Sequence, residues 1–169
     1  DNDVLTSLIG LDGLISIGGG AVIRYNNSLT SLAGLDNVTF IGGSLEINKN
    51  NALSSFAGLY NVTSIEGELY IVRNASLTSL TGLESLTAID GNVYVCCNGS
   101  LTSLTGIENV DAESIDNLII KQNAFLSECE VQSICNYLVS PNGIIEIFGN
   151  AIGCNGPVEI ANTCEITLP

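Results

Sequence analysis

The sequence predicts a mainly β fold, a right-handed parallel β-helix (solenoid) of about five coils, closed by a small helix-containing, disulfide-bonded C-terminal cap. Three observations support this fold class: a 24-residue repeat, apolar residues at fixed positions of each repeat, and cysteines gathered near the C-terminus. Repeats this short cannot bury their own apolar side and are stable only when stacked on neighbours. We therefore expect one domain, with coils over residues 1–126 and a cap over 127–169.

The repeat is clearest over residues 77–100, and a leucine recurs at every 24-residue step from Leu5 to Leu101. Six further columns are apolar in the same way, so seven side chains per coil should point inward. The last two columns are two residues apart, as in LEIN at 45–48, which is typical of a half-buried strand. The fifth copy holds extra residues, which we place between Val110 and Ile115.

Glycine and asparagine mark the corners of the coils. Every copy has a glycine at the position of Gly10, which favours tight corners over helix. An asparagine follows the main strand in each copy, and stacked inward asparagines can bind backbone groups freed at a corner. We interpret this column as structural; it consists of Asn26, Asn50, Asn74, Asn98 and Asn123.

The two ends of the array differ. Toward the C-terminus, the segment 127–140 has near-helical apolar spacing, 144–150 forms one more strand, and Pro157 opens a short helix. At the N-terminus no cap is visible, so a preceding segment, a short irregular segment or a second copy should cover Leu5 and Leu8. A homodimer through this end is one expectation. The chain begins at Asp1 without a leader, so we expect that a signal peptide was removed or precedes this sequence.

The cysteines indicate an oxidising compartment. Their number is even, there is no histidine, and four of the six lie in the last 41 residues. Their spacings lack the C-x2-C pairs typical of zinc sites. The preferred pairing joins Cys129 to Cys154 and Cys135 to Cys164, although four cysteines allow three connectivities. For the adjacent Cys96 and Cys97 we favour a bond to each other, with free thiols or an intermolecular link as alternatives.

Charge and composition exclude several function classes. Eighteen acids against four bases give a net charge of −14, which repels nucleic acids, and no apolar run is long enough for membrane insertion. Without histidine, catalysis needs a tuned carboxylate. A regular acidic column looks like a solvated stripe; it comprises Asp12, Asp36, Glu84 and Glu108. We expect no enzyme, no cofactor and no metal site, with a carboxylate-based polysaccharide-degrading enzyme as the weakest alternative.

The strand motif I-x-G-x-L-x-I-x-x-N, found at 41–50 and 65–74, resembles the receptor L domain of insulin- and epidermal-growth-factor-type receptor ectodomains. It is also similar to L-domain-like and leucine-rich-repeat segments of secreted bacterial surface proteins, which close with a turn like GNAIGCN at 149–155. The resemblance implies a secreted or cell-surface recognition or adhesion module. The cysteine-linked N-terminal helix of the receptors is missing, so no hormone-binding residue is carried over.

The outward column of the main strand is the candidate surface for a protein or glycan ligand. Exposed aromatic and apolar groups on a rigid sheet suit recognition. The column consists of Val22, Glu46, Tyr70, Tyr94 and Ile119, and we expect the four bases to form a single stripe beside it: Arg24, Lys49, Arg73 and Lys121.

A second regular surface suggests an alternative function. A Ser-x-Thr ladder on a flat sheet would resemble the lattice of ice-binding (antifreeze) solenoids, although serine and threonine also simply tolerate such positions. The ladder comprises Ser28, Thr30, Ser76, Thr78, Ser100 and Thr102, with Ala52 and Ser54 in one coil. Glycosylation sequons occur at Asn26, Asn37, Asn61, Asn74 and Asn98, where the repeat itself can generate the triplets by chance.

Overall fold

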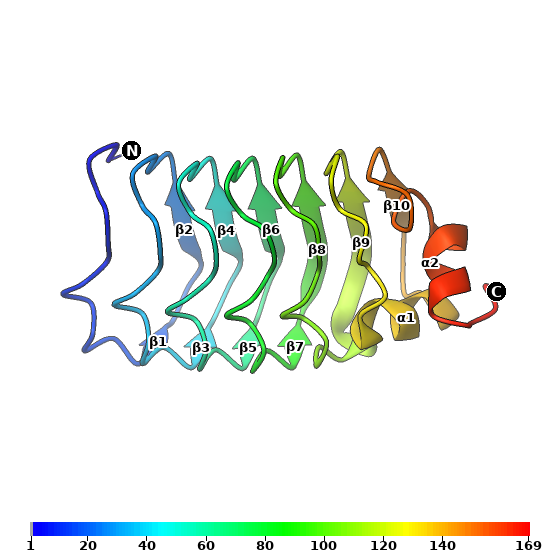
Figure 1. The fold of residues 1–169 in the computed structure, drawn as a ribbon. Helices are drawn as coiled ribbons and strands as arrows, with labels where there is room; N and C mark the ends of the chain where they lie inside the picture. Colours follow the sequence, from blue (N-terminus) through cyan, green and yellow to red (C-terminus); the bar gives the residue numbers. More distant parts are fainter. Residues whose placement is uncertain (1) are drawn as a thin grey trace.

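The computed structural model describes residues 2–169 as a β-solenoid of about six turns, with the N-terminus at one end and two helices at the other (Figure 1). Asp1, the first residue of the predicted coil region, lies outside the described residues. The predicted fold class is confirmed. The sixth turn comes from the segment assigned to the cap, because its strand continues the main sheet.

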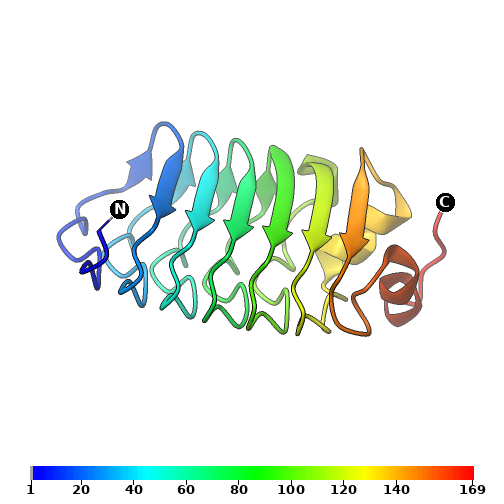
Figure 2. The same cartoon turned by 90° about the horizontal axis from the view of Figure 1, so that it is seen from above.

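The large sheet is parallel, and its strands lie side by side, one after another along the length of the rod (Figure 2). Its register follows the repeat, since Ala21 pairs with Leu45 and Leu45 with Leu69. In spatial order the strands are β2 (Ala21–Arg24), β4 (Leu45–Asn48), β6 (Leu69–Val72), β8 (Gly91–Cys96), β9 (Ile115–Lys121) and β10 (Ile145–Phe148).

A second, four-stranded parallel sheet forms another side of each of the first four coils. Its strands are β1 (Ser16–Ile17), β3 (Phe40–Ile41), β5 (Ser64–Ile65) and β7 (Ala88–Ile89). In the fifth coil the short helix η1 (Ala112–Ser114) takes the place of such a strand. Asp111 caps η1 by accepting a hydrogen bond from the Glu113 amide.

The position of the insertion in the fifth coil was predicted wrongly. Ile115 pairs with Gly91, still at the 24-residue step, whereas Val93 pairs with Leu118 at a step of 25. The extra residue is therefore a bulge within β9, after Ile115. A bulge absorbs one residue while the strand continues, so the sheet passes this coil without a break.

The core consists of vertical rows of aliphatic side chains. All seven predicted inward positions are buried in the second to fifth coils. In the first coil Leu5 and Leu8 are only half-buried and Leu11 is 46% exposed, since among residues 2–169 nothing packs on their outer side. The N-terminal end is uncapped in the described chain, and whether a second copy covers it stays a prediction.

The C-terminal end is covered by α1 (Gln132–Val139) and α2 (Pro157–Thr163). Disulfides join Cys129 to Cys154 and Cys135 to Cys164, the connectivity preferred from the sequence. Cys129 and Cys154 are fully buried. The second disulfide joins α1 to the C-terminal end of α2, and the first joins the segments that precede the two helices, so the two halves of the cap are held together covalently.

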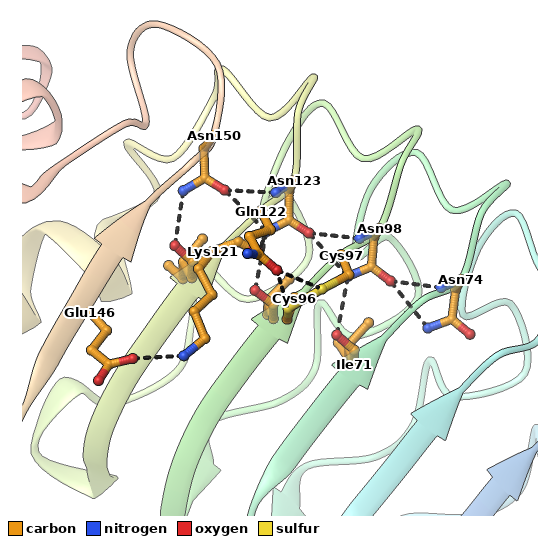
Figure 3. The surroundings of a disulfide bond; sticks show 12 residues. Ile71, Asn74, Cys96, Cys97, Asn98, Lys121, Gln122, Asn123, Glu146 and Asn150 are labelled. Carbon is orange, nitrogen blue, oxygen red and sulfur yellow. Dashed lines mark hydrogen bonds and ion pairs between the residues drawn. A yellow bond between two sulfur atoms is a disulfide. The ribbon is translucent and has the colours of Figure 1, made fainter.

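The asparagine column forms a continuous hydrogen-bonded ladder inside one corner of the rod (Figure 3). In each step the side-chain oxygen of one asparagine accepts from the backbone N–H of the asparagine one coil earlier. Asn98 Oδ1, for example, lies 2.9 Å from Asn74 N, and Asn98 Nδ2 donates to the Ile71 carbonyl at 3.1 Å. Asn2 and Asn150 extend the ladder at its two ends.

The residue before each ladder asparagine has left-handed backbone geometry. This conformation turns the chain so that the next side chain points inward, and it is unfavourable for residues other than glycine. The corner column is Tyr25, Lys49, Arg73, Cys97 and Gln122, with φ between 55° and 63°, and it ends at Gly149.

Candidate ligand-binding face

The outer face is defined here as the outward side chains of the large sheet together with the corner column. Strand pairing places the predicted outward column as expected, with one residue in each coil from Val22 to Ile119. Strand β10 adds Glu146 to this column. A second outward column runs parallel to it: Arg24, Asn48, Val72, Cys96, Lys121 and Phe148.

Tyr70 and Tyr94 stack on one another at the centre of this face. Their ring centroids are 4.9 Å apart and the ring planes differ by 14°. The stacking covers one face of each ring, and both side chains are half-buried. Burial raises the pKa of Tyr70, and the neighbouring Tyr94 and Glu46 raise it further, so its phenol is protonated at neutral pH.

Lys121 organises the C-terminal part of the face. Its Nζ lies 2.8 Å from Glu146 Oε2 and over the rings of Tyr94 and Phe148, at 5.4 and 5.6 Å. The hydrogen bond to Glu146 raises the pKa of Lys121, so the ammonium stays charged. Two aromatic rings and an ion pair thus form one cluster, whose members Phe148 and Glu146 the sequence reasoning missed.

The four bases do not form the single stripe that the sequence predicted. Arg24 and Lys121 belong to the second outward column. Lys49 and Arg73 stand in the corner column, which is one residue further along the chain. Within residues 2–169 the only ion pair is that of Lys121, so the other three bases have no carboxylate partner. Lys49 instead lies over the Tyr25 ring, 4.7 Å from its centroid.

The margin opposite the corner carries Glu68, which directly precedes β6. Glu68 lines a shallow hollow together with Ser44 and with Tyr70 and Glu46 of the predicted outward column. Both carboxylates accept hydrogen bonds from neighbouring asparagine side chains, at 3.2 Å for Glu46 and 2.6 Å for Glu68. The face therefore has an aromatic centre between a basic corner and an acidic margin.

The Ser-x-Thr ladder does not form a flat lattice. Thr30, Thr78 and Thr102 are exposed, but they lie outside the strands, on the irregular side of the coils. Some hydroxyls bind the chain itself, since Thr102 Oγ1 donates to the Thr78 carbonyl and Ser28 Oγ to that of Asp3. Because the ladder lies outside the sheets, the ice-binding alternative finds no support in this geometry.

The acidic column is accessible to solvent, with Asp12 and Asp36 exposed and Glu84 and Glu108 half-buried, and its carboxylates also bind the corner backbone. Each carboxylate accepts a hydrogen bond from the amide of the glycine two residues earlier, as Asp36 does from Gly34 at 2.8 Å. The same contact occurs at Asp12, Glu84 and Glu108. In the part of the chain that the structure describes, no group of histidine, cysteine or acidic residues is arranged to hold a metal ion.

Three of the five sequons are inaccessible. Asn26, Asn74 and Asn98 are buried rungs of the ladder, as their structural interpretation requires. Asn37 and Asn61 are exposed, and their Nδ2 atoms donate to the carbonyls of Asp12 and Asp36.

The comparisons with known proteins agree with this architecture. The family model for the receptor L domain matches residues 15–104 and 37–138. Neither the search of curated proteins nor the search of solved structures found a match. Among the helices over residues 2–169, none has the length and apolar character to cross a membrane.

Proposed function

The chain belongs to the receptor L domain family, and we propose that it is a non-enzymatic binding domain that recognises a protein ligand on its outer face. The observation that carries the proposal is the stacked Tyr70–Tyr94 pair, held at the centre of a rigid sheet between oppositely charged margins. Family membership supports ligand binding in general, and the face supports the particular surface.

The composition of the face suits a protein interface. Tyrosine and arginine are enriched among residues that contribute most to protein binding, and they act best at a centre surrounded by polar groups. Tyr70 and Tyr94 occupy the centre, and Arg73 stands beside them with no carboxylate partner in the described chain. Because the sheet is fixed by its neighbours in both directions, little ordering entropy would be lost on binding.

The tyrosine geometry favours a protein over a glycan. A sugar ring would pack on the broad face of an aromatic ring, but each ring of the pair covers one face of the other. The tyrosine hydroxyls instead suit hydrogen bonds to backbone and side-chain groups. A peptide segment that carries both charges would complement the basic corner and the acidic margin.

The disulfides support an extracellular location. Disulfides form and persist in oxidising compartments, and this domain has three. We therefore place the domain outside the cell, where its ligand is a secreted or surface-displayed protein. Adhesion between cells and recognition of a free ligand would use the same face.

The proposal is tested by capture of extracellular proteins and measurement of their affinity. Replacing Tyr70 and Tyr94 by alanine should weaken a captured partner by about 2 kcal/mol, or roughly thirtyfold, because both side chains lie at the centre of the face. Binding is measured by surface plasmon resonance, and folding by circular dichroism.

The matched control is Tyr60→Ala. Tyr60 is 47% exposed and follows the corner glycine Gly58, away from the large sheet. Its replacement should leave the affinity unchanged. Equal affinities of the wild-type and Tyr70→Ala/Tyr94→Ala proteins would remove the outer face as the site, and capture of glycans alone would replace the protein ligand by a sugar.

A further inference from the structure

The disulfide between Cys96 and Cys97 lies at the edge of the outer face (Figure 3). Cys96 is the last residue of β8 and belongs to the second outward column, between Val72 and Lys121. Cys97 follows it in the corner column. The bond is distant from the cap, which contains the other two disulfides.

The backbone does not need this disulfide. Cys97 has a φ of 63°, and the same conformation occurs at Lys49, Arg73 and Gln122, with φ of 56°, 55° and 58°, where no disulfide is present. A bond between adjacent residues also encloses almost no chain, so it restricts the unfolded state little. The cap disulfides, in contrast, join cysteines 25 and 29 residues apart.

Adjacency makes this disulfide easier to reduce than the others. The Cα atoms of Cys96 and Cys97 are 3.8 Å apart, the spacing of neighbours in any chain. Disulfides usually span about 4.4–6.8 Å, and departure from that range favours reduction. The cap disulfides span 5.7 and 5.8 Å, within the usual range.

The surroundings suit attack at one sulfur and accommodate the products. Cys97 is partly exposed whereas Cys96 is only 5% exposed, so a thiolate from solvent reaches the sulfur of Cys97. Gln122 Oε1 lies 3.3 Å from Cys97 Sγ and 3.9 Å from Cys96 Sγ. A disulfide sulfur has no proton to donate to this oxygen, but a thiol has one, so the acceptor stabilises the reduced form.

The neighbouring corner position carries a base. Arg73 occupies the corner position one coil before Cys97, and its amide donates to the Cys96 carbonyl. Its guanidinium has no ion-pair partner within residues 2–169. Cationic neighbours stabilise a thiolate, which is both the attacking and the leaving species of disulfide exchange.

We propose that Cys96–Cys97 is a thiol–disulfide exchange site for low-molecular-weight thiols, which opens and closes while the domain stays folded. The thiolate of one small thiol attacks Cys97 Sγ, the Sγ–Sγ bond breaks, and Cys96 leaves as a thiolate that takes a proton from water. A second small thiolate attacks the mixed disulfide and releases the Cys97 thiolate, which is protonated. Two electrons pass from the two small thiols, which leave as their own disulfide.

The experiment uses the full chain and reduced glutathione as the probe. Samples are withdrawn over time, alkylated with iodoacetamide and mapped by peptide mass spectrometry, while circular dichroism follows the fold. We expect alkylation of Cys97, the more exposed partner, at least tenfold faster than that of the four cap cysteines, with an unchanged spectrum. Labelling of the cap cysteines at the same rate, or no labelling until the spectrum is lost, would overturn the proposal.

The chain offers its own control for the pair. The preceding coil has Val72 and Arg73 at the corresponding positions, so the variant Cys96→Val/Cys97→Arg restores a sequence that the same corner already accepts. It should fold, take up no label under the same conditions and keep the wild-type melting temperature within about 2 °C. A large loss of stability in this variant would show that the disulfide is structural and would contradict an exchange site. This test needs no ligand, so it is independent of the proposed binding function.

Discussion

At the scale of single residues, the asparagine ladder shows how one polar side chain can stabilise every coil. A buried corner leaves backbone N–H and C=O groups without partners, and such groups are costly unless they are hydrogen-bonded. Asn74 satisfies two of them, because its Oδ1 accepts from Asn50 N at 3.0 Å and its Nδ2 donates to the Ile47 carbonyl at 2.9 Å. The side chain itself is fully buried.

Replacing Asn74 by alanine should therefore destabilise the domain strongly. Two buried backbone groups lose their partners, which costs about 2–5 kcal/mol in the free energy of unfolding. Urea denaturation measures the change. The control Asn51→Ala removes an exposed asparagine from the same corner and should cost less than about 0.5 kcal/mol. Equal stabilities of the two variants would contradict a structural ladder.

The inward role of this column could be predicted from the sequence, but its neighbours could not. A polar residue that recurs beside buried leucines must be satisfied by something, and only the backbone of the next coil is close enough. The left-handed geometry of Lys49 and Arg73 gives no comparable signal, because glycine or asparagine is the usual residue in that conformation. For the same reason the sequence placed these two bases in the wrong column.

At the scale of elements, each coil turns at a corner glycine whose surroundings depend on the coil before it. Gly58 has a φ of +112°, and a Cβ atom there would lie 2.2 Å from the Leu32 carbonyl oxygen. Gly10 has nearly the same φ, +110°, but a Cβ atom would meet no other described atom within 4 Å. The two glycines therefore share the conformational requirement and differ in the close approach of a neighbouring coil.

This pair separates backbone strain from coil stacking. Gly10→Ala should cost about 1–2 kcal/mol through its φ alone. Gly58→Ala adds a clash with the preceding coil and should cost about 3 kcal/mol more than Gly10→Ala, because the coils must separate. Thermal unfolding of both variants gives the difference. Similar losses at the two positions would mean that the coils are not in contact at this corner.

The elements themselves were largely predictable, since a 24-residue step fixes both the strands and their register. The fifth coil was not, because the pattern shows that a residue is added but not where the chain absorbs it. Ile115 stays in register with Gly91, and the bulge follows it. The reason is local: η1 and the Ser114 hydroxyl, which accepts from the Ile89 amide, hold the start of β9 in place.

At the scale of the whole molecule, stacking turns each column into a continuous surface of one chemical character. The net charge of −14 makes an uncompensated basic corner unusual, and its position beside the Tyr70–Tyr94 stack defines the outer face. The sequence identified the tyrosines, because identical steps place them one above the other. It did not identify Phe148 or Glu146, because the steps of 25 and 27 residues that lead to β10 break the simple repeat.

The central claim is that the outer face is the binding surface, and hydroxyl-radical footprinting of the domain with a captured partner protein tests it most directly. Phe148 and Tyr60 serve as matched reporters, because each is 47% exposed in the free domain. The account predicts that the partner reduces the oxidation of Phe148, Tyr70 and Tyr94 and leaves that of Tyr60 unchanged. Protection of Tyr60 with no change at Phe148 would contradict it.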